Sequence, residues 1–236
     1  MLLVAATTMP SCGTTRSVNP ELDQKLPPRI LWAWERKEDL RFLDPKRFGV
    51  AFLAQTLKLN TSNVSLVPRR QPLEVAPGSF MIAVTRIETD KRKEARPILD
   101  ADQRRRMIEL IKQTLELPDV KAIQIDFDAG VSERRFYRDL MNSLRSELPA
   151  DIPLTMTALA SWCAGDNWFS DLPVDEAIPM AFVMGADSER VKEFLAKGND
   201  WREPLCRGSY GFAVDEPIDA PLKSGRRIYF FKSSAW

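Results

Sequence analysis

The stretch AIQIDFDAG, residues 122–130, places a polar side chain at every second position of an otherwise apolar run. Residues two apart on a β-strand point to the same face, so one face of this segment is apolar and the other carries Gln124, Asp126 and Asp128. The next stretch, SERRFYRDLMNSLRSEL (residues 132–148), repeats apolar residues at helical spacing and begins at Ser132, a residue type that caps helices. A strand followed directly by a helix is the repeating unit of a parallel α/β sheet.

The same alternation of strands and helices runs along most of the chain. Strand-like apolar runs occur at Arg29–Glu35, Gly49–Leu57, Phe80–Glu88, Ala122–Gly130, Pro153–Trp162, Ala177–Gly185, Tyr210–Glu216 and Arg226–Lys232. Apolar periodicity predicts helices over residues 100–117, 132–148 and 188–198, and a short helix over residues 38–48. Residues 60–77 lack that periodicity and are expected to form an extended arm or a hairpin.

These elements predict the fold class. Strands that alternate with helices are joined by right-handed crossovers, so that the strands run parallel. Eight such strands in a chain of 236 residues predict an irregular (β/α)8 TIM-type barrel, in which some helices are short or missing. An open, doubly wound sheet is the alternative. We expect one barrel domain over residues 29–236, preceded by a separate segment over residues 1–28.

The composition narrows the chemistry that this chain can perform. The net charge is +1, which gives no electrostatic reason to expect a nucleic-acid partner. The chain contains no histidine, which excludes Ser-His and Cys-His nucleophiles. Any enzymatic proton transfer must therefore use carboxylates, tyrosine, lysine or arginine. The cysteine spacing is not typical of a metal site, and we expect neither a metal nor a cofactor.

The N-terminal segment resembles the end of a secretory signal. MLLVAATTMPSC (residues 1–12) is apolar and then rich in small residues, and its last four residues resemble a bacterial lipoprotein cleavage box with Cys12 as the lipidated residue. We expect a bacterial periplasmic or cell-envelope protein, attached to a membrane through Cys12 or secreted; a disordered apolar tail is the alternative. Export would allow Cys163 and Cys206 to form a disulfide, whereas in the cytosol both would be buried thiols.

Acidic residues gather at one end of the predicted strands. In a TIM-type barrel the catalytic groups lie at the carboxyl ends of the strands. The acids at this end are Glu35, Glu88, Asp126, Asp128 and Asp215. Strand geometry places the Cα atoms of Asp126 and Asp128 roughly 6.5–7 Å apart on one face. Two carboxylates this close raise the pKa of one of them, which can then act as a general acid in glycoside hydrolysis.

Structural roles for the two aspartates remain open at this point. They can form ion pairs with Arg86 inside the barrel, Asp128 can begin a turn and cap the next helix, or the pair can bind Ca²⁺ or Mg²⁺ through hard carboxylate oxygens. Tryptophans near the predicted rim are candidates for stacking on sugar rings, although large aromatic residues more often pack in cores. These tryptophans are Trp34, Trp162 and Trp236.

The strand AIQIDFDA resembles the signature of the chitinase-like family eighteen glycoside hydrolases, an Asp-x-Asp-x-Glu run on the fourth barrel strand. On that pattern Gln124 stands at the first aspartate, Asp126 at the second and Asp128 at the acidic glutamate. PMAFVMGAD (residues 179–187) is similar to the Met-x-Tyr-Asp strand of the family, with Phe182 at the tyrosine. Trp236 is similar to the tryptophan that forms the floor of the family's sugar subsite.

Three departures from the family pattern change what this resemblance implies. Gln124 carries no charge, Asp128 is one methylene shorter than glutamate, and Phe182 has no hydroxyl to hold an acetamido group. The resemblance therefore does not favour substrate-assisted hydrolysis of N-acetylated sugars. A two-carboxylate mechanism is the better match, with Asp128 as the acid and Asp215, which shares a strand face with two small residues, as the nucleophile or base.

A closer similarity is to an uncharacterised bacterial family, a domain of unknown function with a glycosidase-like barrel. The chain resembles it in LWAWERKEDLRFLD, IQIDFDAGVSERRFYRDL, TALASWCAGDNW, LPVDEAIPM and the final IYFFKSSAW, which are spread over nearly all of residues 29–236. This resemblance implies a barrel and export, but it brings no established activity.

Together these observations predict an exported, glycoside-hydrolase-like protein that acts on a polysaccharide or glycoconjugate. Asp128 is the expected general acid, Asp126 the partner that raises its pKa, and Asp215 the opposing carboxylate. The expected substrate contacts are Glu35, Glu88, Gln124, Trp34, Trp162 and Trp236. The alternative is a non-catalytic carbohydrate-binding protein of the cell envelope, and a third interpretation is a structural envelope protein with neither activity.

Overall fold

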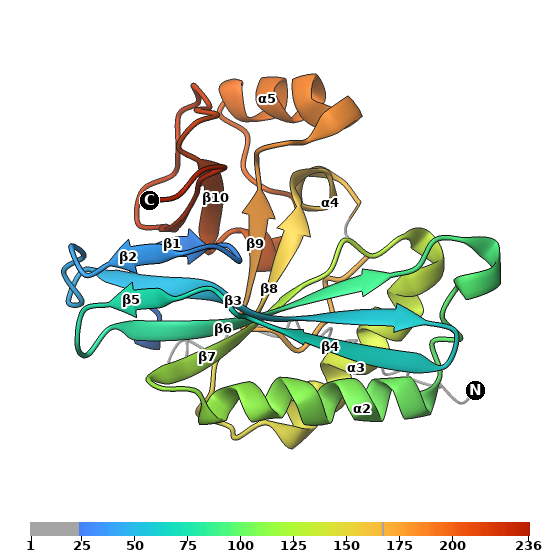
Figure 1. Cartoon of the computed structure of the whole chain (residues 1–236). Helices are drawn as coiled ribbons and strands as arrows, with labels where there is room; N and C mark the ends of the chain where they lie inside the picture. The colour runs from blue at the N-terminus through green and yellow to red at the C-terminus, as the bar shows by residue number, and fades with distance from the viewer. Residues whose placement is uncertain (1–23, 167) are drawn as a thin grey trace, which may run out of the picture.

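Eight parallel strands close into a barrel in the computed structural model, which describes residues 24–166 and 168–236 (Figure 1). The barrel strands are β1 (Arg29–Ala33), β3 (Phe48–Asn60), β6 (Phe80–Thr89), β7 (Val120–Asp126), β8 (Leu154–Leu159), β9 (Glu176–Met180), β10 (Ser209–Ala213) and β11 (Arg227–Phe231). The prediction of an irregular (β/α)8 TIM-type barrel is confirmed, and the open doubly wound sheet is excluded.

Closure of the barrel depends on β1, which pairs with the last barrel strand on one side and with the second on the other. Leu31 lies opposite Phe230 of β11 and opposite Val50 of β3, in parallel register in both cases. From β3 the order continues through β6, β7, β8, β9 and β10 to β11. The carboxyl ends of all barrel strands therefore meet at one end, which is the end where TIM-type barrels carry their sites.

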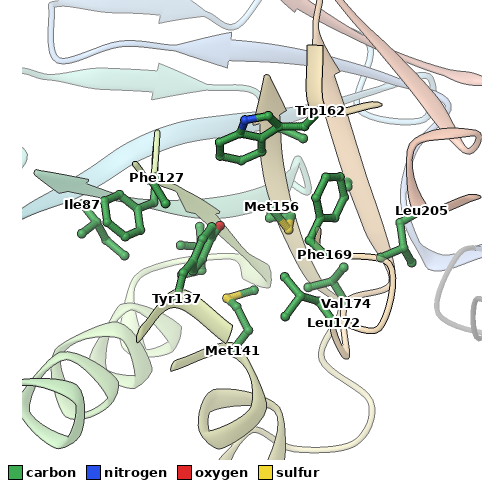
Figure 2. Close-up of a cluster of buried hydrophobic side chains, with 14 of the residues drawn as sticks. Ile87, Phe127, Tyr137, Met141, Met156, Trp162, Phe169, Leu172, Val174 and Leu205 are labelled. Carbon is green, nitrogen blue, oxygen red and sulfur yellow. The ribbon is translucent and has the colours of Figure 1, made fainter. Parts of the chain in front are cut away.

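Helices cover the side of the barrel around β6 to β9 (Figure 1). They are α2 (Ala101–Gln113), α3 (Arg134–Glu147), α4 (Ala160–Ala164) and α5 (Ser188–Ala196), with short 3-10 turns at η1 (Lys93–Ala95), η2 (Thr114–Glu116), η3 (Val131–Glu133), η4 (Gly185–Asp187) and η5 (Pro204–Cys206). The helix α2 begins where the side chain of Asp100 accepts a hydrogen bond from the backbone N–H of Gln103. Tyr137 and Met141 of α3 lie in a buried apolar cluster with Met156 of β8 (Figure 2).

A two-stranded sheet, rather than a helix, covers the outer face of β1, β3 and β6. It pairs β2 (Glu38–Leu40) in parallel with β5 (Leu73–Val75). The short helix predicted over residues 38–48 is wrong, because the residues of β2 alternate between buried and exposed, which is the two-residue period of a strand. Leu40 is fully buried and packs in the apolar cluster on that outer face.

The first part of the segment between β3 and β6 forms a hairpin, which is one of the two structures expected from the sequence. Its strand β4 (Asn63–Pro68) pairs antiparallel with the second half of β3, in a register that places Asn60 opposite Asn63. The hairpin lies outside the closed barrel and extends the sheet at β3. The expectation of an extended arm or a hairpin over residues 60–77 is therefore confirmed for residues 60–68, whereas residues 73–75 form β5 and pair with β2.

The amino-terminal end of the barrel is closed by a buried ion pair. Arg227 Nη1 lies 2.6 Å from Glu176 Oε1, and both side chains are almost fully buried. Tyr229 donates a hydrogen bond from its hydroxyl to the other carboxylate oxygen of Glu176 at 2.9 Å. Arg227 also donates to the backbone oxygen of Pro27, so the segment before β1 is held beneath the barrel. These polar side chains at the amino-terminal end of the barrel thus pair with one another and stabilise the fold.

A disulfide joins Cys163 of α4 to Cys206 of η5, and it is the pair expected for an exported protein. Both residues are fully buried. Cys12 lies outside the described residues, so its lipidation stays a prediction. Across residues 24–166 and 168–236, every helix is too short or too polar to pass through a bilayer.

Replacing both cysteines by alanine (Cys163→Ala with Cys206→Ala) should lower the free energy of unfolding by about 4 kcal/mol, because the unfolded chain is then no longer closed into a loop. Urea denaturation followed by tryptophan fluorescence measures this change. A reductant should lower the urea midpoint of the wild type to that of the double variant. The midpoint of the double variant should not change. A wild-type protein that is insensitive to the reductant would contradict the prediction.

Candidate active site at the carboxyl ends of the strands

The polar face of β7 points into the barrel, as its alternation predicted, and begins with Gln124. This side chain is fully buried; its Oε1 accepts a hydrogen bond from Trp32 Nε1 at 2.8 Å, and its Nε2 donates one to Thr155 Oγ1 at 3.2 Å. Gln124 was predicted as a substrate contact, and the structure places it behind Trp32, whose indole lines the cavity described below. Gln124 therefore orients Trp32, which lines the cavity, and does not line the cavity itself.

Asp126, the last residue of β7, is held on both carboxylate oxygens. Oδ2 lies 2.9 Å from Arg86 Nη1, and Oδ1 accepts a hydrogen bond from Thr157 Oγ1 at 2.7 Å. The Asp126 side chain is only 3% exposed, so a charge here needs the cation that Arg86 supplies. The ion pair with Arg86, one of the structural roles left open by the sequence, is thus present.

Asp128 lies just beyond the end of β7 at the mouth of the barrel. Within residues 24–166 and 168–236, its carboxyl group accepts no hydrogen bond and forms no ion pair, in contrast to Asp126. Asp128 as a residue is exposed to solvent, but the protein around its carboxyl group removes part of its hydration and so raises its pKa; the negative charge of Asp126 raises this pKa further, while Arg86 and Lys91 act in the opposite direction. A carboxyl group that keeps its proton toward higher pH is suited to act as an acid.

Asp126 and Asp128 line a cavity of about 290 Å³, here called the first hollow. Its walls are mostly apolar and include Trp34, Met180, Phe182 and Phe231, and its charged residues are Arg86, Asp126, Asp128 and Asp187. These residues come from the carboxyl ends of β1, β6, β7, β9 and β11 and from the loops that follow. An apolar cavity with a few charged groups converging on it is the usual form of a small-molecule site.

Asp187 is a residue of the first hollow that the sequence analysis did not single out. It ends η4, directly before α5, and its carboxylate lies 2.7 Å from Arg190 Nη2. The hydrogen bond from Arg190 is the largest cause and lowers the pKa of Asp187; burial opposes it, and a hydrogen bond with Ser161 and the charge of Arg190 add to the lowering. The first hollow therefore holds one carboxyl group with a raised pKa and one with a lowered pKa, a pattern associated with separate acid and base roles.

Asp215 lies in a different cavity from Asp128. The strand β10 ends at Ala213, so Asp215 stands in the turn beyond it and is exposed. Its carboxylate accepts hydrogen bonds from the backbone N–H of Ser233 at 3.1 Å and from the Ser233 hydroxyl, and these bonds lower the pKa of Asp215. It lines a cavity of about 490 Å³, here called the second hollow, which adjoins the first.

The two glutamates predicted as substrate contacts serve the framework of the mouth. Glu35 Oε1 accepts hydrogen bonds from the backbone N–H groups of Arg70 at 2.8 Å and Gln71 at 3.1 Å, which ties the loop after β1 to the loop after β4. Glu88 lies 3.3 Å from Arg86 Nε and so supports the cation that pairs with Asp126. Neither glutamate lines the first hollow.

The three candidate tryptophans have different environments. Trp34 is half-buried and lines both hollows. Trp162 is buried in the outer apolar core (Figure 2), packed edge-on against Trp168 with 5.2 Å between ring centroids, so its ring faces neither hollow. Trp236 donates from its indole N–H to the backbone oxygen of Trp32 at 3.0 Å and packs on the outer face of β1 and β3. Trp34 is thus the one of the three that is available to a ligand in these cavities.

The described part of the chain, residues 24–166 and 168–236, contains no group of three or more acidic or cysteine side chains arranged to hold a metal ion. In that part of the chain Asp126 and Asp128 therefore have no third acidic or cysteine side chain with which to form such a group, and their cation-binding role stays an alternative. Arg86 already supplies a positive charge to Asp126.

Comparison with known proteins identifies a shared fold. No protein-family model and no curated protein matches the chain in sequence. The crystal structure of the Bacillus cereus spore cortex-lytic enzyme SleL is similar, with a TM-score of 0.52 and 16% sequence identity. The match covers 84% of this chain and 54% of the SleL chain, so this chain spans about half of that neighbour's length. At this identity the similarity shows the fold alone, and the chain is therefore a TIM-type barrel with a candidate acidic site at its strand ends.

Removing the cation beside Asp126 should destabilise the barrel. In Arg86→Met the buried carboxylate loses its partner, and because Arg86 is itself partly exposed and screened we expect a loss of about 2 kcal/mol in the free energy of unfolding. Arg92→Met, which removes an exposed arginine paired with Asp90, should change the stability much less, because water screens that pair. Urea denaturation compares the two variants.

The double variant Arg86→Met with Asp126→Leu removes both charges and should recover most of the stability that Arg86→Met loses. The assignment is wrong if Arg86→Met is as stable as Arg92→Met, or if the double variant is no more stable than the single one.

Proposed function

We propose that this protein is a glycoside-hydrolase-like protein that acts on a polysaccharide or glycoconjugate at the carboxyl-end mouth of its barrel. The proposal rests chiefly on the environment of Asp128. Its carboxyl group lines the first hollow without a partner among the described residues, and its pKa is raised by burial and by Asp126. An unpaired carboxyl group with a raised pKa, in a cavity with mostly apolar walls, is suited to protonate a glycosidic oxygen.

In the proposed reaction, Asp128 donates its proton to the oxygen of the scissile glycosidic bond. Cleavage of that bond leaves positive charge on the sugar ring, and negative charge fixed nearby stabilises it. Asp126 can supply this charge without moving, because Arg86 and Thr157 hold both of its oxygens. Gln124 acts only indirectly, through the orientation of Trp32.

The second carboxylate of the reaction is proposed to be Asp187. It lines the same hollow as Asp128, and its lowered pKa keeps it ionised, as a nucleophile or a base for water must be. Asp215, the residue expected from the sequence, lines the second hollow and could take this role only for a substrate that reaches there.

Sugar recognition is proposed to rely on aromatic faces. Trp34, Phe182 and Phe231 line the first hollow, and flat aromatic rings suit the apolar faces of sugar rings. The partner is therefore a carbohydrate. The barrel shared with a spore cortex-lytic enzyme is compatible with a carbohydrate partner, which is inferred from the side chains that line the first hollow.

Export is a further part of the proposal. The disulfide between Cys163 and Cys206 supports an oxidising compartment such as the bacterial periplasm or cell surface. The apolar, small-residue-rich N-terminal segment supports a signal-like role, with Cys12 as the site of lipid attachment to the membrane.

A non-catalytic carbohydrate-binding protein is the second candidate. It is favoured by Gln124, which stands where the chitinase-like pattern has an aspartate and is buried as a neutral amide. The side chain of Asp128, one methylene shorter than the glutamate of that pattern, also favours a non-catalytic protein. Such a protein would keep the aromatic hollow and bind sugars without cleaving them.

Asp128→Asn tests the proposal on a panel of peptidoglycan, chitin, cellulose and xylan. Hydrolysis should fall about 100-fold or more, because removal of a general acid typically costs that much, while affinity for the cleaved glycan stays close to that of the wild type. Wild-type activity should also decline as the pH rises through the raised pKa of Asp128, because the acid then loses its proton.

Asp219→Asn, which changes an exposed aspartate outside both hollows, is the matched control and should keep full activity. Full activity of Asp128→Asn would overturn the assignment of the acid. Glycan binding by the wild type without hydrolysis of any member of the panel would favour the carbohydrate-binding protein instead.

A further inference from the structure

Val183 has an unusual backbone conformation at the mouth of the barrel. Its φ is +48°, in the left-handed region that β-branched residues rarely adopt. Its side chain is 83% exposed, so the valine contributes almost nothing to the core in return for this strain. Strained conformations of this kind persist where the surrounding structure enforces them, and they cluster at functional sites.

The neighbours of Val183 hold it in place. Its backbone N–H donates a hydrogen bond to Glu216 Oε2 at 2.9 Å, which links the loop after β9 to the loop after β10. The preceding residue, Phe182, packs on Phe231 with 4.5 Å between ring centroids. The backbone of Val183 is thus fixed from the loop side and from the barrel side, and its side chain is directed away from the core.

The position of Val183 between the two hollows distinguishes it from other strained residues. Trp34, Phe182, Val183 and Phe231 line both hollows and form the ridge between them. Thr61 is also β-branched with a positive φ, of 41°, but it stands in the tight turn between β3 and β4, where the hairpin itself demands that conformation. No comparable hairpin explains Val183, which connects β9 to η4.

We propose that Val183 is a specificity-determining residue, held on the ridge so that a glycan occupying both hollows packs its inter-ring linkage against the valine side chain. This inference rests on the proposed function. One sugar ring lies in the first hollow beside Asp128, and the next ring lies in the second hollow, whose walls are continuous with the first through the ridge. Val183 thereby favours chains of at least two rings over single sugars.

The test measures affinity against chain length by calorimetry, with N-acetylglucosamine and glucose as single rings and their β-1,4-linked oligomers of two to six rings. The wild type should bind at least one series, with affinity rising from one ring to two. Val183→Gly removes the side chain and accepts the left-handed backbone. It should weaken binding of the oligomers about tenfold and leave binding of the single ring unchanged.

Thr61→Gly is the matched control, because it relieves strain of the same kind at a residue that lines neither hollow. Both variants should unfold at a urea concentration no lower than that of the wild type, and Thr61→Gly should bind every sugar as the wild type does. Oligomer binding that is unchanged in Val183→Gly overturns this inference and leaves the proposed function standing. A wild-type protein that binds no member of either series overturns this inference, and the hydrolysis panel then decides the proposed function separately.

Discussion

The ion pair between Arg86 and Asp126 is the interaction on which the candidate site depends. A carboxylate this deeply buried is costly unless a cation and hydrogen bonds compensate it, and Arg86 with Thr157 provides both. Because Asp126 is held in this way, its charge stands at a fixed position two residues from Asp128. The raised pKa of Asp128 follows partly from that charge, so the pair that stabilises the barrel interior also prepares the acid at its mouth.

Local periodicity explains why much of the fold could be predicted from the sequence. The side-chain period of a strand is a property of the chain itself, so the inward face of β7 followed from alternation, and the eight barrel strands followed from apolar runs that recur between helical segments. The helix expected over residues 38–48 failed because β2 is stabilised by pairing with β5, a contact between segments far apart in the sequence. Apolar spacing over so short a segment does not reveal such a partner.

The residues of the site were harder to predict than the fold, because the residue at which a strand ends decides which of its side chains reach the site. Alternation counted through Asp215 placed that residue inward, but β10 stops at Ala213, where the chain turns and Asp215 bonds to Ser233. Asp187 lies in a turn, where no periodicity exists to reveal it. Trp162 was read as the end of a strand, whereas α4 begins at Ala160 and carries the indole into the outer core.

The proposed function depends most on Asp128, an acid whose pKa is raised beside a fixed negative charge. Carbon-13 NMR of the side-chain carboxyl groups, titrated with pH, measures this pKa directly in the wild type and in Asp126→Asn. Wild-type Asp128 should titrate above 3.8, the ordinary value for aspartate, and its pKa should fall in the variant, where one of the two raising effects is gone. If Asp128 titrates at or below its ordinary value, or does not respond to Asp126→Asn, its assignment as the acid is wrong.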